Sequence, residues 1–189
     1  MSDNKRLRVV ILASGAGSLA QAVFDAKLDL NILALISDKK SQALEKATNF
    51  GIPAIFLPVS TDRELWNSQI ISKIGDLAPD LVVSLGFMRI LPKEFVDRFP
   101  TINTHPALLP SFPGAHAVRD ALAAGVSQTG STVHWVDEGV DTGKVIAQVP
   151  VAISASDTEE SLHERIKIAE RLLIVETLQA FIDNGINGA

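Results

Sequence analysis

Three polar residues that stand near glycine- and proline-rich turns could together carry out acyl transfer: Asn103, His105 and Asp141. Moving an acyl group from one nitrogen to another requires a polarised carbonyl, a stabilised oxyanion, and removal of a proton from the attacking ammonium group. An asparagine amide can donate to the oxyanion, and a histidine near a carboxylate can hold a positive charge or deliver a proton. Each residue also has a purely structural explanation, because histidines end strands and aspartates cap turns in many proteins.

A second candidate site is the glycine-rich turn Gly15-Ala16-Gly17-Ser18-Leu19-Ala20, which joins an apolar segment to a helical pattern. With Asp38 after the next apolar segment, it fits the G-x-G-x-x-A variant of the dinucleotide-binding fingerprint. The backbone N–H groups of Gly17, Ser18 and Leu19 at a helix start can bind a lone phosphate equally well. Three interpretations therefore stay open: a nucleotide cofactor site, a single phosphate site, or a turn without a ligand.

The composition argues against several other classes of chemistry. The 189 residues include no cysteine, which excludes disulfides, thiolate nucleophiles and zinc ribbons. The 4 histidines lack metal-binding spacing and no G-x-S-x-G occurs, so we predict neither a metal site nor a serine nucleophile. A formal net charge of -5 without clustered Lys and Arg predicts no nucleic-acid partner. No apolar run approaches the roughly 18 residues of a membrane span, so we expect a soluble, cytoplasmic protein.

The elements that must position these residues alternate between strand and helix. Short apolar segments at 8–12, 30–37, 54–57 and 81–85 predict buried strands, separated by helical patterns at 19–26, 41–50 and from Thr61 or Asp62 to Pro79. This order predicts an α/β fold with a doubly wound, mostly parallel sheet and helices on both faces. We expect one domain spanning residues 1–189. The buried face of the third helix is predicted to be Leu65, Ile70, Ile71, Ile74 and Leu77.

The second half of the chain continues this pattern around a proline-rich loop. A strand at 101–104 ends at His105, so we expect His105 beside Gly86 on the carboxyl rim of the sheet, where ligands bind in open α/β sheets. The prolines that follow predict a rigid loop, in which we expect a cis bond at Leu109-Pro110. A helix at 118–124, strands at 130–136 and 144–151 around an acidic loop, and a helix from Asp157 or Thr158 to about 184 complete the chain. In this last helix, the residues predicted to face the sheet are Leu162, Ile166, Ala169 and Leu173.

Taken together, these motifs resemble the formyltransferase family that uses 10-formyltetrahydrofolate. The resemblance runs from about residue 9 to 181 and rests on five motifs in order: Ser14-Gly15-x-Gly17-Ser18, Gly86-Phe87-Met88-Arg89-Ile90-Leu91, Asn103-x-His105-Pro106-x-Leu108-Leu109-Pro110, Phe112-Pro113-Gly114 and Asp141-x-Gly143. It implies a Rossmann-like formyltransferase fold. Within the family, the chain is most similar to the members that formylate glycinamide ribonucleotide in purine biosynthesis. The members that formylate methionyl-tRNA or hydrolyse formyltetrahydrofolate carry an added domain, for which we expect no room in this length.

The resemblance also implies roles for particular residues. The catalytic residues would be Asn103, His105 and Asp141, with 10-formyltetrahydrofolate as co-substrate, no metal, and a monomeric or homodimeric protein. The phosphate and ribose of the ribonucleotide would bind Gly17, Ser18, Leu19, Lys167 and Glu170. The folate would bind Arg63, Met88, Arg89, Ile90, Leu91, Asn103, Val136, Asp137, Glu138, Gly139, Val140 and Asp141. Many relatives have asparagines where this chain has Ala16 and Leu19, so we expect backbone donors alone at its phosphate turn.

Two other functions and one structural alternative remain open at this point. Water could replace the amine, which would make the protein a formyltetrahydrofolate hydrolase. A nicotinamide-nucleotide-binding domain could be built on Gly15-x-Gly17-x-x-Ala20 and Asp38, but it assigns no role to Asn103, His105 and Asp141. Lys167 and Glu170 could instead form a surface ion pair, because residues three apart are neighbours on a helix.

Overall fold

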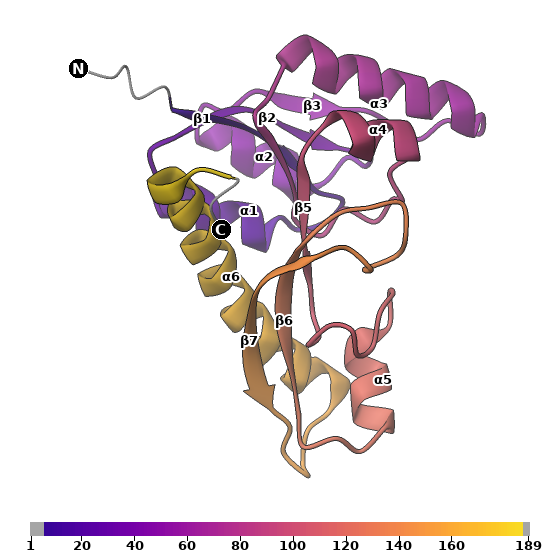
Figure 1. Cartoon of the computed structure of the whole chain (residues 1–189), viewed down its shortest axis with the longest axis vertical. Coiled ribbons are helices and arrows are strands. Elements are labelled where there is room, and N and C mark those ends of the chain that lie inside the picture. Colours follow the sequence, from indigo (N-terminus) through magenta and orange to yellow (C-terminus); the bar gives the residue numbers. More distant parts are fainter. Residues whose placement is uncertain (1–5, 187–189) are drawn as a thin grey trace.

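The computed structural model describes residues 6–186, which form one seven-stranded sheet flanked by helices (Figure 1). The strand order across the sheet is β3-β2-β1-β4-β5-β6-β7. The strands are β1 (Leu7–Leu12), β2 (Leu30–Ser37), β3 (Ala54–Phe56), β4 (Leu81–Ser84), β5 (Thr101–His105), β6 (Gln128–Trp135) and β7 (Val145–Ala152). The helices are α1 (Ser18–Asp25), α2 (Gln42–Asn49), α3 (Arg63–Leu77), α4 (Lys93–Arg98), α5 (Ala117–Ala123) and α6 (Glu159–Asn184).

The first five strands are parallel, and the last two are antiparallel to their neighbours. The central strands β1 and β4 are buried nearly throughout, as expected for parallel strands that helices cover on both faces. The edge strand β7 instead alternates between more and less exposed residues. The sequence-based prediction of a doubly wound, mostly parallel sheet is therefore confirmed.

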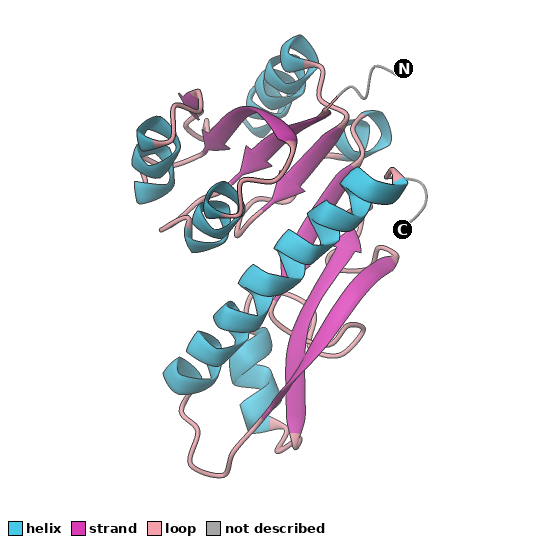
Figure 2. Cartoon of the chain, turned by 90° about the vertical axis from the view of Figure 1, so that its left-hand side faces the viewer, coloured by secondary structure: helices cyan, strands magenta, loops and turns pink. Residues whose placement is uncertain are grey.

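Helices cover the two faces of the sheet with separate apolar cores. On one face, α1, α2 and α6 pack against alternate residues of the central strands, and α6 also runs along β6 and β7 (Figure 2). On the other face, α3 and α4 pack against the intervening residues of the same strands. Because side chains alternate along a strand, each central strand contributes to both cores, and its carboxyl end is fixed from both sides.

The buried face of α3 differs from the prediction at one position, and α4 was not predicted. Leu65 is 50% exposed, whereas Trp66 is fully buried with Ile70 and Ile74. Trp66, Ile70 and Ile74 are four residues apart, which keeps them on one side of the helix, and Leu65 lies about 100° away from that side. Asp62 caps α3 by accepting from the Leu65 N–H at 3.0 Å, as one of the two predicted caps.

The long helix α6 begins at a capping box and buries a polar residue. Thr158, one of the two predicted caps, accepts from the Ser161 N–H at 3.2 Å, which stabilises a helix start by about 1 kcal/mol. Ala169, one of the residues predicted on the sheet side, is partly buried, and the next residue, Glu170, is buried. None of the helices within residues 6–186 has the length and apolarity needed to cross a membrane.

Candidate active site

The catalytic candidates meet at the carboxyl rim of the sheet, where the sequence analysis places them. The turn after β1 and the loop after β4 contact each other directly. The Ser14 N–H donates to the Gly86 carbonyl at 3.2 Å, and the Met88 N–H donates to Ser14 Oγ at 2.8 Å. The phosphate turn and the predicted folate loop are therefore parts of one continuous rim.

His105 lies at the end of β5 with hydrogen-bond acceptors at both ring nitrogens. Its Nε2 is 2.8 Å from the Phe112 carbonyl oxygen, and its Nδ1 is 3.3 Å from Asp141 Oδ2. The imidazole is buried at 4% exposure, so few water molecules compete for these contacts. The imidazolium form satisfies both acceptors, because it carries a hydrogen on each nitrogen.

Asp141 is held in place by contacts from several segments. Its Oδ2 accepts from the Gly114 N–H at 2.8 Å, and its Oδ1 is 3.5 Å from His134 Nε2. Burial alone would raise the pKa of Asp141, but His134, the Gly114 amide and the charge of His105 outweigh burial and hold this pKa below its ordinary value. Asp141 is therefore ionised at neutral pH and faces His105 as a negative charge.

The glycine in the Asp141-x-Gly143 motif has a steric reason. A Cβ added at Gly143 would lie 1.7 Å from the Trp135 carbonyl oxygen at the end of β6. Only a residue without a side chain lets the loop return this close to the strand. The close return keeps Asp141, which has an uncommon positive φ of 55°, turned toward the rim.

The proline-rich loop after His105 supplies the Phe112 carbonyl that faces His105 and the Gly114 N–H that donates to Asp141. Its Leu109-Pro110 bond is cis, as predicted. Thr132 on β6 accepts from the Leu109 N–H at 3.1 Å and donates to the Ala107 carbonyl at 2.6 Å, while Gln148 on β7 donates to the Leu109 carbonyl at 2.8 Å. The loop is therefore tied to the sheet.

Asn103 stands two residues before His105 and is oriented by residues that the sequence analysis missed or left without a chemical role. His134 Nδ1 lies 2.8 Å from the Trp135 carbonyl, which can only accept, so Nδ1 carries a hydrogen. His134 Nε2 lies 3.2 Å from Asn103 Nδ2 and 3.5 Å from Asp141 Oδ1, and Asn103 Oδ1 accepts from Ser84 Oγ at 2.8 Å. This chain of contacts leaves one N–H of the Asn103 amide free for a ligand oxygen.

Removal of the Ser84 hydroxyl is expected to loosen the Asn103 amide. Ser84→Ala should lower kcat about five- to tenfold, the equivalent of one hydrogen bond at about 1 to 1.4 kcal/mol, with both KM values within about twofold. Ser131→Ala is a matched control, because Ser131 is also a buried serine of the sheet and its hydroxyl has no hydrogen-bond partner among residues 6–186. Equal losses of kcat in the two variants would contradict this role of Ser84.

The predicted phosphate turn has the geometry of an anion site. Gly17 caps α1 with a positive φ of 69°, and a Cβ there would lie 2.7 Å from Ala43 Cβ, so glycine is required. Ser18 and Leu19 follow as the first residues of α1, whose N–H groups point out of the helix end. The Leu19 side chain is buried in the core, so this residue can offer a ligand only its backbone, as predicted.

Lys167 and Glu170 lie on α6, which packs against α1, but they do not form the ion pair considered above. Lys167 Nζ contacts Glu164 Oε1 at 2.7 Å, whereas Glu170 is buried at 5% exposure. Burial raises the pKa of Glu170 to about 7, although Thr104, Lys167 and Arg171 each lower it in part. A buried carboxyl whose pKa lies near neutrality, beside Thr104 of β5, is typical of a ligand site rather than of a surface pair.

Apart from Arg63 of α3 and Asn103 of β5, the predicted folate-binding residues lie in two loops, 86–91 and 136–141. Lys93, at the start of α4, lies 3.8 Å from Glu138, and the Asp141–Gly114 contact joins the second loop to the chain after β5. The side chains of Met88, Ile90 and Val140 are exposed apolar groups on this rim. Such exposed apolar groups suit a flat ring system.

The remaining residues of this predicted set have structural partners. The Leu91 side chain belongs to the core, and Val136 is partly buried at the end of β6. Asp137 shapes its own loop by accepting from the Gly139 N–H at 3.0 Å and from Thr142 Oγ1 at 2.7 Å. Arg63 stacks on Trp66 and donates to the Ile90 carbonyl. These contacts give the two loops a defined shape without a ligand.

The nicotinamide alternative is not supported by the surroundings of Asp38. In a dinucleotide site, the acidic residue after the second strand must be free to bind a ribose hydroxyl. Asp38 Oδ2 instead pairs with Arg89 Nε at 2.6 Å, and the Asp38 side chain is completely buried. The carboxylate is therefore not available to a ribose.

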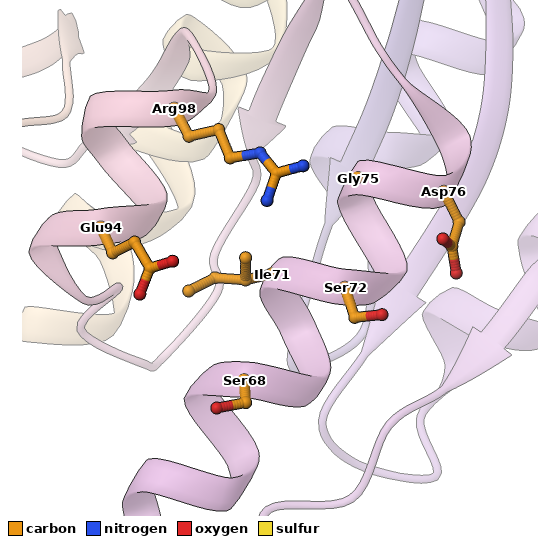
Figure 3. A pocket seen from close by; sticks show the side chains of 7 residues that line it. All are labelled: Ser68, Ile71, Ser72, Gly75, Asp76, Glu94 and Arg98. Carbon is orange, nitrogen blue, oxygen red and sulfur yellow. The ribbon is translucent and has the colours of Figure 1, made fainter.

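A separate cavity of about 440 Å³ lies between α3 and α4 (Figure 3). It is lined by Ser68, Ile71, Ser72, Gly75, Asp76, Glu94 and Arg98. No residue of the predicted sites borders it, so we place the active site at the sheet rim. Within residues 6–186, no three His, Cys, Asp or Glu side chains are grouped as metal ligands.

The fold and the rim together define an α/β enzyme whose buried imidazole and partly buried carboxylate and amide suit acyl transfer. Residues 7–178 match the formyl transferase family, and the chain belongs to that family. It is 46% identical over 186 residues to phosphoribosylglycinamide formyltransferase of Mycobacterium tuberculosis, covering 95% of this chain and 86% of the relative. It is 39% identical to the trifunctional purine biosynthetic protein adenosine-3 of Drosophila melanogaster, covering 98% of this chain and 14% of that protein.

A solved structure agrees with these sequence relatives. The crystal structure of glycinamide ribonucleotide transformylase 1 from Symbiobacterium toebii superimposes with a TM-score of 0.90 at 33% identity, covering 94% of this chain and 88% of that one. The Rossmann-like formyltransferase fold implied by the sequence is therefore confirmed, and the chain is a transferase.

Proposed function

We propose that this protein transfers the formyl group of 10-formyltetrahydrofolate to the amine of glycinamide ribonucleotide, giving formylglycinamide ribonucleotide and tetrahydrofolate. The observation that carries the proposal is the buried contact between His105 Nδ1 and Asp141 Oδ2 at 3.3 Å, with Asn103 on the same strand end. The names of the relatives given above support the choice of both substrates.

In the proposed mechanism, the neutral amine of the ribonucleotide attacks the formyl carbon and forms a tetrahedral intermediate. The free N–H of Asn103 and the His105 imidazolium stabilise the oxyanion, which carries the charge that develops in the transition state. The Asp141 carboxylate faces Nδ1 of this imidazolium at 3.3 Å. The bond from the formyl carbon to the folate nitrogen then breaks, and the proton lost by the attacking amine is relayed, with Asp141 assisting through water, to that departing nitrogen.

The two substrates bind to adjoining parts of the rim in this proposal. The backbone N–H groups of Gly17, Ser18 and Leu19 bind the phosphate, with Lys167 as a nearby cation once it leaves Glu164. Glu170 accepts hydrogen bonds from the ribose hydroxyls. The folate lies between the loops 86–91 and 136–141, mainly against backbone groups. The shared catalytic centre then lies between the two binding sites.

The raised pKa of Glu170 predicts a pH-dependent affinity for the ribonucleotide. With a pKa of about 7, Glu170 is mainly protonated at pH 6 and mainly ionised at pH 8, and only the carboxylate accepts fully from both hydroxyls of a ribose. The KM for the ribonucleotide should therefore fall about three- to tenfold between pH 6 and 8. Glu170→Gln should abolish this dependence, and an unchanged pH dependence in the variant would assign the titration to another group.

The same pKa shift has a consequence for stability. A carboxyl whose pKa is higher in the folded state costs stability as pH rises from its unfolded value, 4.5, to about 7. Between pH 4.5 and 8, the free energy of unfolding of Glu170→Gln should rise by up to about 3 kcal/mol relative to that of the native protein. Urea unfolding at both pH values measures this difference.

Formation of tetrahydrofolate from 10-formyltetrahydrofolate, with and without glycinamide ribonucleotide, tests the proposed function. We expect tetrahydrofolate to appear only when the ribonucleotide is present, in equal amount with the formylated product. Release that does not depend on the ribonucleotide would show the hydrolase reaction instead.

A further inference from the structure

Asp38, at the carboxyl end of β2, has no role in the reaction described above, yet it is a fully buried acid. Its Oδ2 contacts Arg89 Nε at 2.6 Å, and its Oδ1 has no hydrogen-bond partner among residues 6–186. A buried carboxylate requires a cation or hydrogen-bond donors in place of its lost hydration. Arg89 supplies that cation, so the arginine side chain is directed back to β2 and is only 32% exposed.

Arg89 is the middle one of three consecutive loop residues that are each held by a different element. Before it, the Met88 N–H donates to Ser14 Oγ, at the end of β1, over 2.8 Å. After it, the Ile90 carbonyl accepts from Arg63, the first residue of α3. The loop 86–91 is therefore tied at three successive positions to the ends of β1 and β2 and to the start of α3.

These ties matter because side-chain packing does not hold the middle of the loop. Met88 and Ile90 are 65% and 63% exposed, so neither side chain anchors the loop in the core. Hydrogen bonds and the ion pair with Arg89 are the contacts that set its shape between the buried residues Phe87 and Leu91. Of these contacts, only the ion pair depends on a buried charge, which is the Asp38 carboxylate at the end of β2.

We infer that Asp38 is a positioning residue for folate binding, which acts by fixing Arg89 and thereby the shape of the loop 86–91. This inference rests on the proposed function, because it takes the loop as one wall of the folate site. Asp38 does not contact the folate itself in this account. Its loss should weaken folate binding while the catalytic residues and the phosphate turn keep their geometry.

Asp38→Asn tests the inference, since asparagine preserves the shape and removes the charge. We expect the KM for 10-formyltetrahydrofolate, and the Kd of tetrahydrofolate measured by calorimetry, to rise about five- to tenfold. The KM for glycinamide ribonucleotide and kcat should stay within about twofold. Arg89→Gln should likewise raise the folate KM and Kd while the ribonucleotide KM and kcat change little. The folate constants of the double variant should not exceed those of the more impaired single variant, because the two residues act as one unit.

Asp157→Asn is the matched control, because Asp157 and Arg165 form another short carboxylate–guanidinium pair, at 2.5 Å, near the start of α6. We expect this variant to leave both KM values unchanged. A similar rise of the folate KM in Asp157→Asn would indicate a general loss of stability and would overturn the inference. If Asp38→Asn does not fold, the double variant with both charges removed is compared with Arg89→Gln in the same assays.

The unmodified protein separates this inference from the proposed function. If it neither binds tetrahydrofolate nor transfers the formyl group, the proposed function fails. If it does both and Asp38→Asn does so with unchanged folate constants, the function stands and the positioning role of Asp38 is wrong.

Discussion

His105→Ala is expected to lower kcat by about a hundredfold or more, the size typical of a lost general acid or base. The imidazole is buried between the Phe112 carbonyl and the Asp141 carboxylate, and in the proposed mechanism its positive charge stabilises the oxyanion. An alanine leaves Asn103 as the remaining side-chain donor. Because the oxyanion exists only after attack, the effect should fall on kcat and leave both KM values within about threefold.

Steady-state kinetics with both substrates saturating measures this effect, and circular dichroism and thermal unfolding verify the fold. His163→Ala serves as a control, because His163 is a partly buried histidine of α6 that is absent from the catalytic set. Its kcat should match that of the native protein. Near-normal turnover of His105→Ala would remove the histidine from the mechanism.

Asp141→Asn is expected to lower kcat to a similar extent, about a hundredfold. Asparagine is nearly isosteric and can still accept from the Gly114 N–H, so the loop should keep its path. The variant loses the negative charge that faces His105 and the group that assists proton transfer. The loss of kcat therefore reports the charge rather than the shape of the loop.

The lowered pKa of Asp141 adds a pH criterion to the same experiment. The Asp141 carboxyl stays ionised below the pH at which an ordinary aspartate protonates. Protonation of Asp141 should therefore not lower kcat of the native protein near pH 4. The stability that its depressed pKa contributes is present at neutral pH and is lost only as pH falls through the folded-state value. Turnover by Asp141→Asn within about threefold of the native rate would contradict its role.

Much of the fold was predictable because the signals for it are local. Continuous apolar runs indicated the buried parallel strands, and glycine and proline indicated the turns between them. The closely spaced prolines also predicted the cis bond at Leu109-Pro110. Short helix α4 was missed, because its six residues carry little periodic signal. Leu65 was misplaced for a related reason, since neighbouring apolar residues do not by themselves show which one turns inward.

The candidate site also has some features that the sequence predicts and others that only the folded structure shows. Residue types and their order along the chain singled out Asn103, His105 and Asp141 as candidates, and the structure brings the side chains of His105 and Asp141 together. The orientation of Asn103 by Ser84, the pairing of Asp38 with Arg89, and the burial of Glu170 could not be predicted, although each residue is plain in the sequence. A hydrogen bond or ion pair between distant residues depends on how strands are ordered and which helix covers which face. Local propensity carries no information about that order, so these partners emerge only when the sheet is assembled.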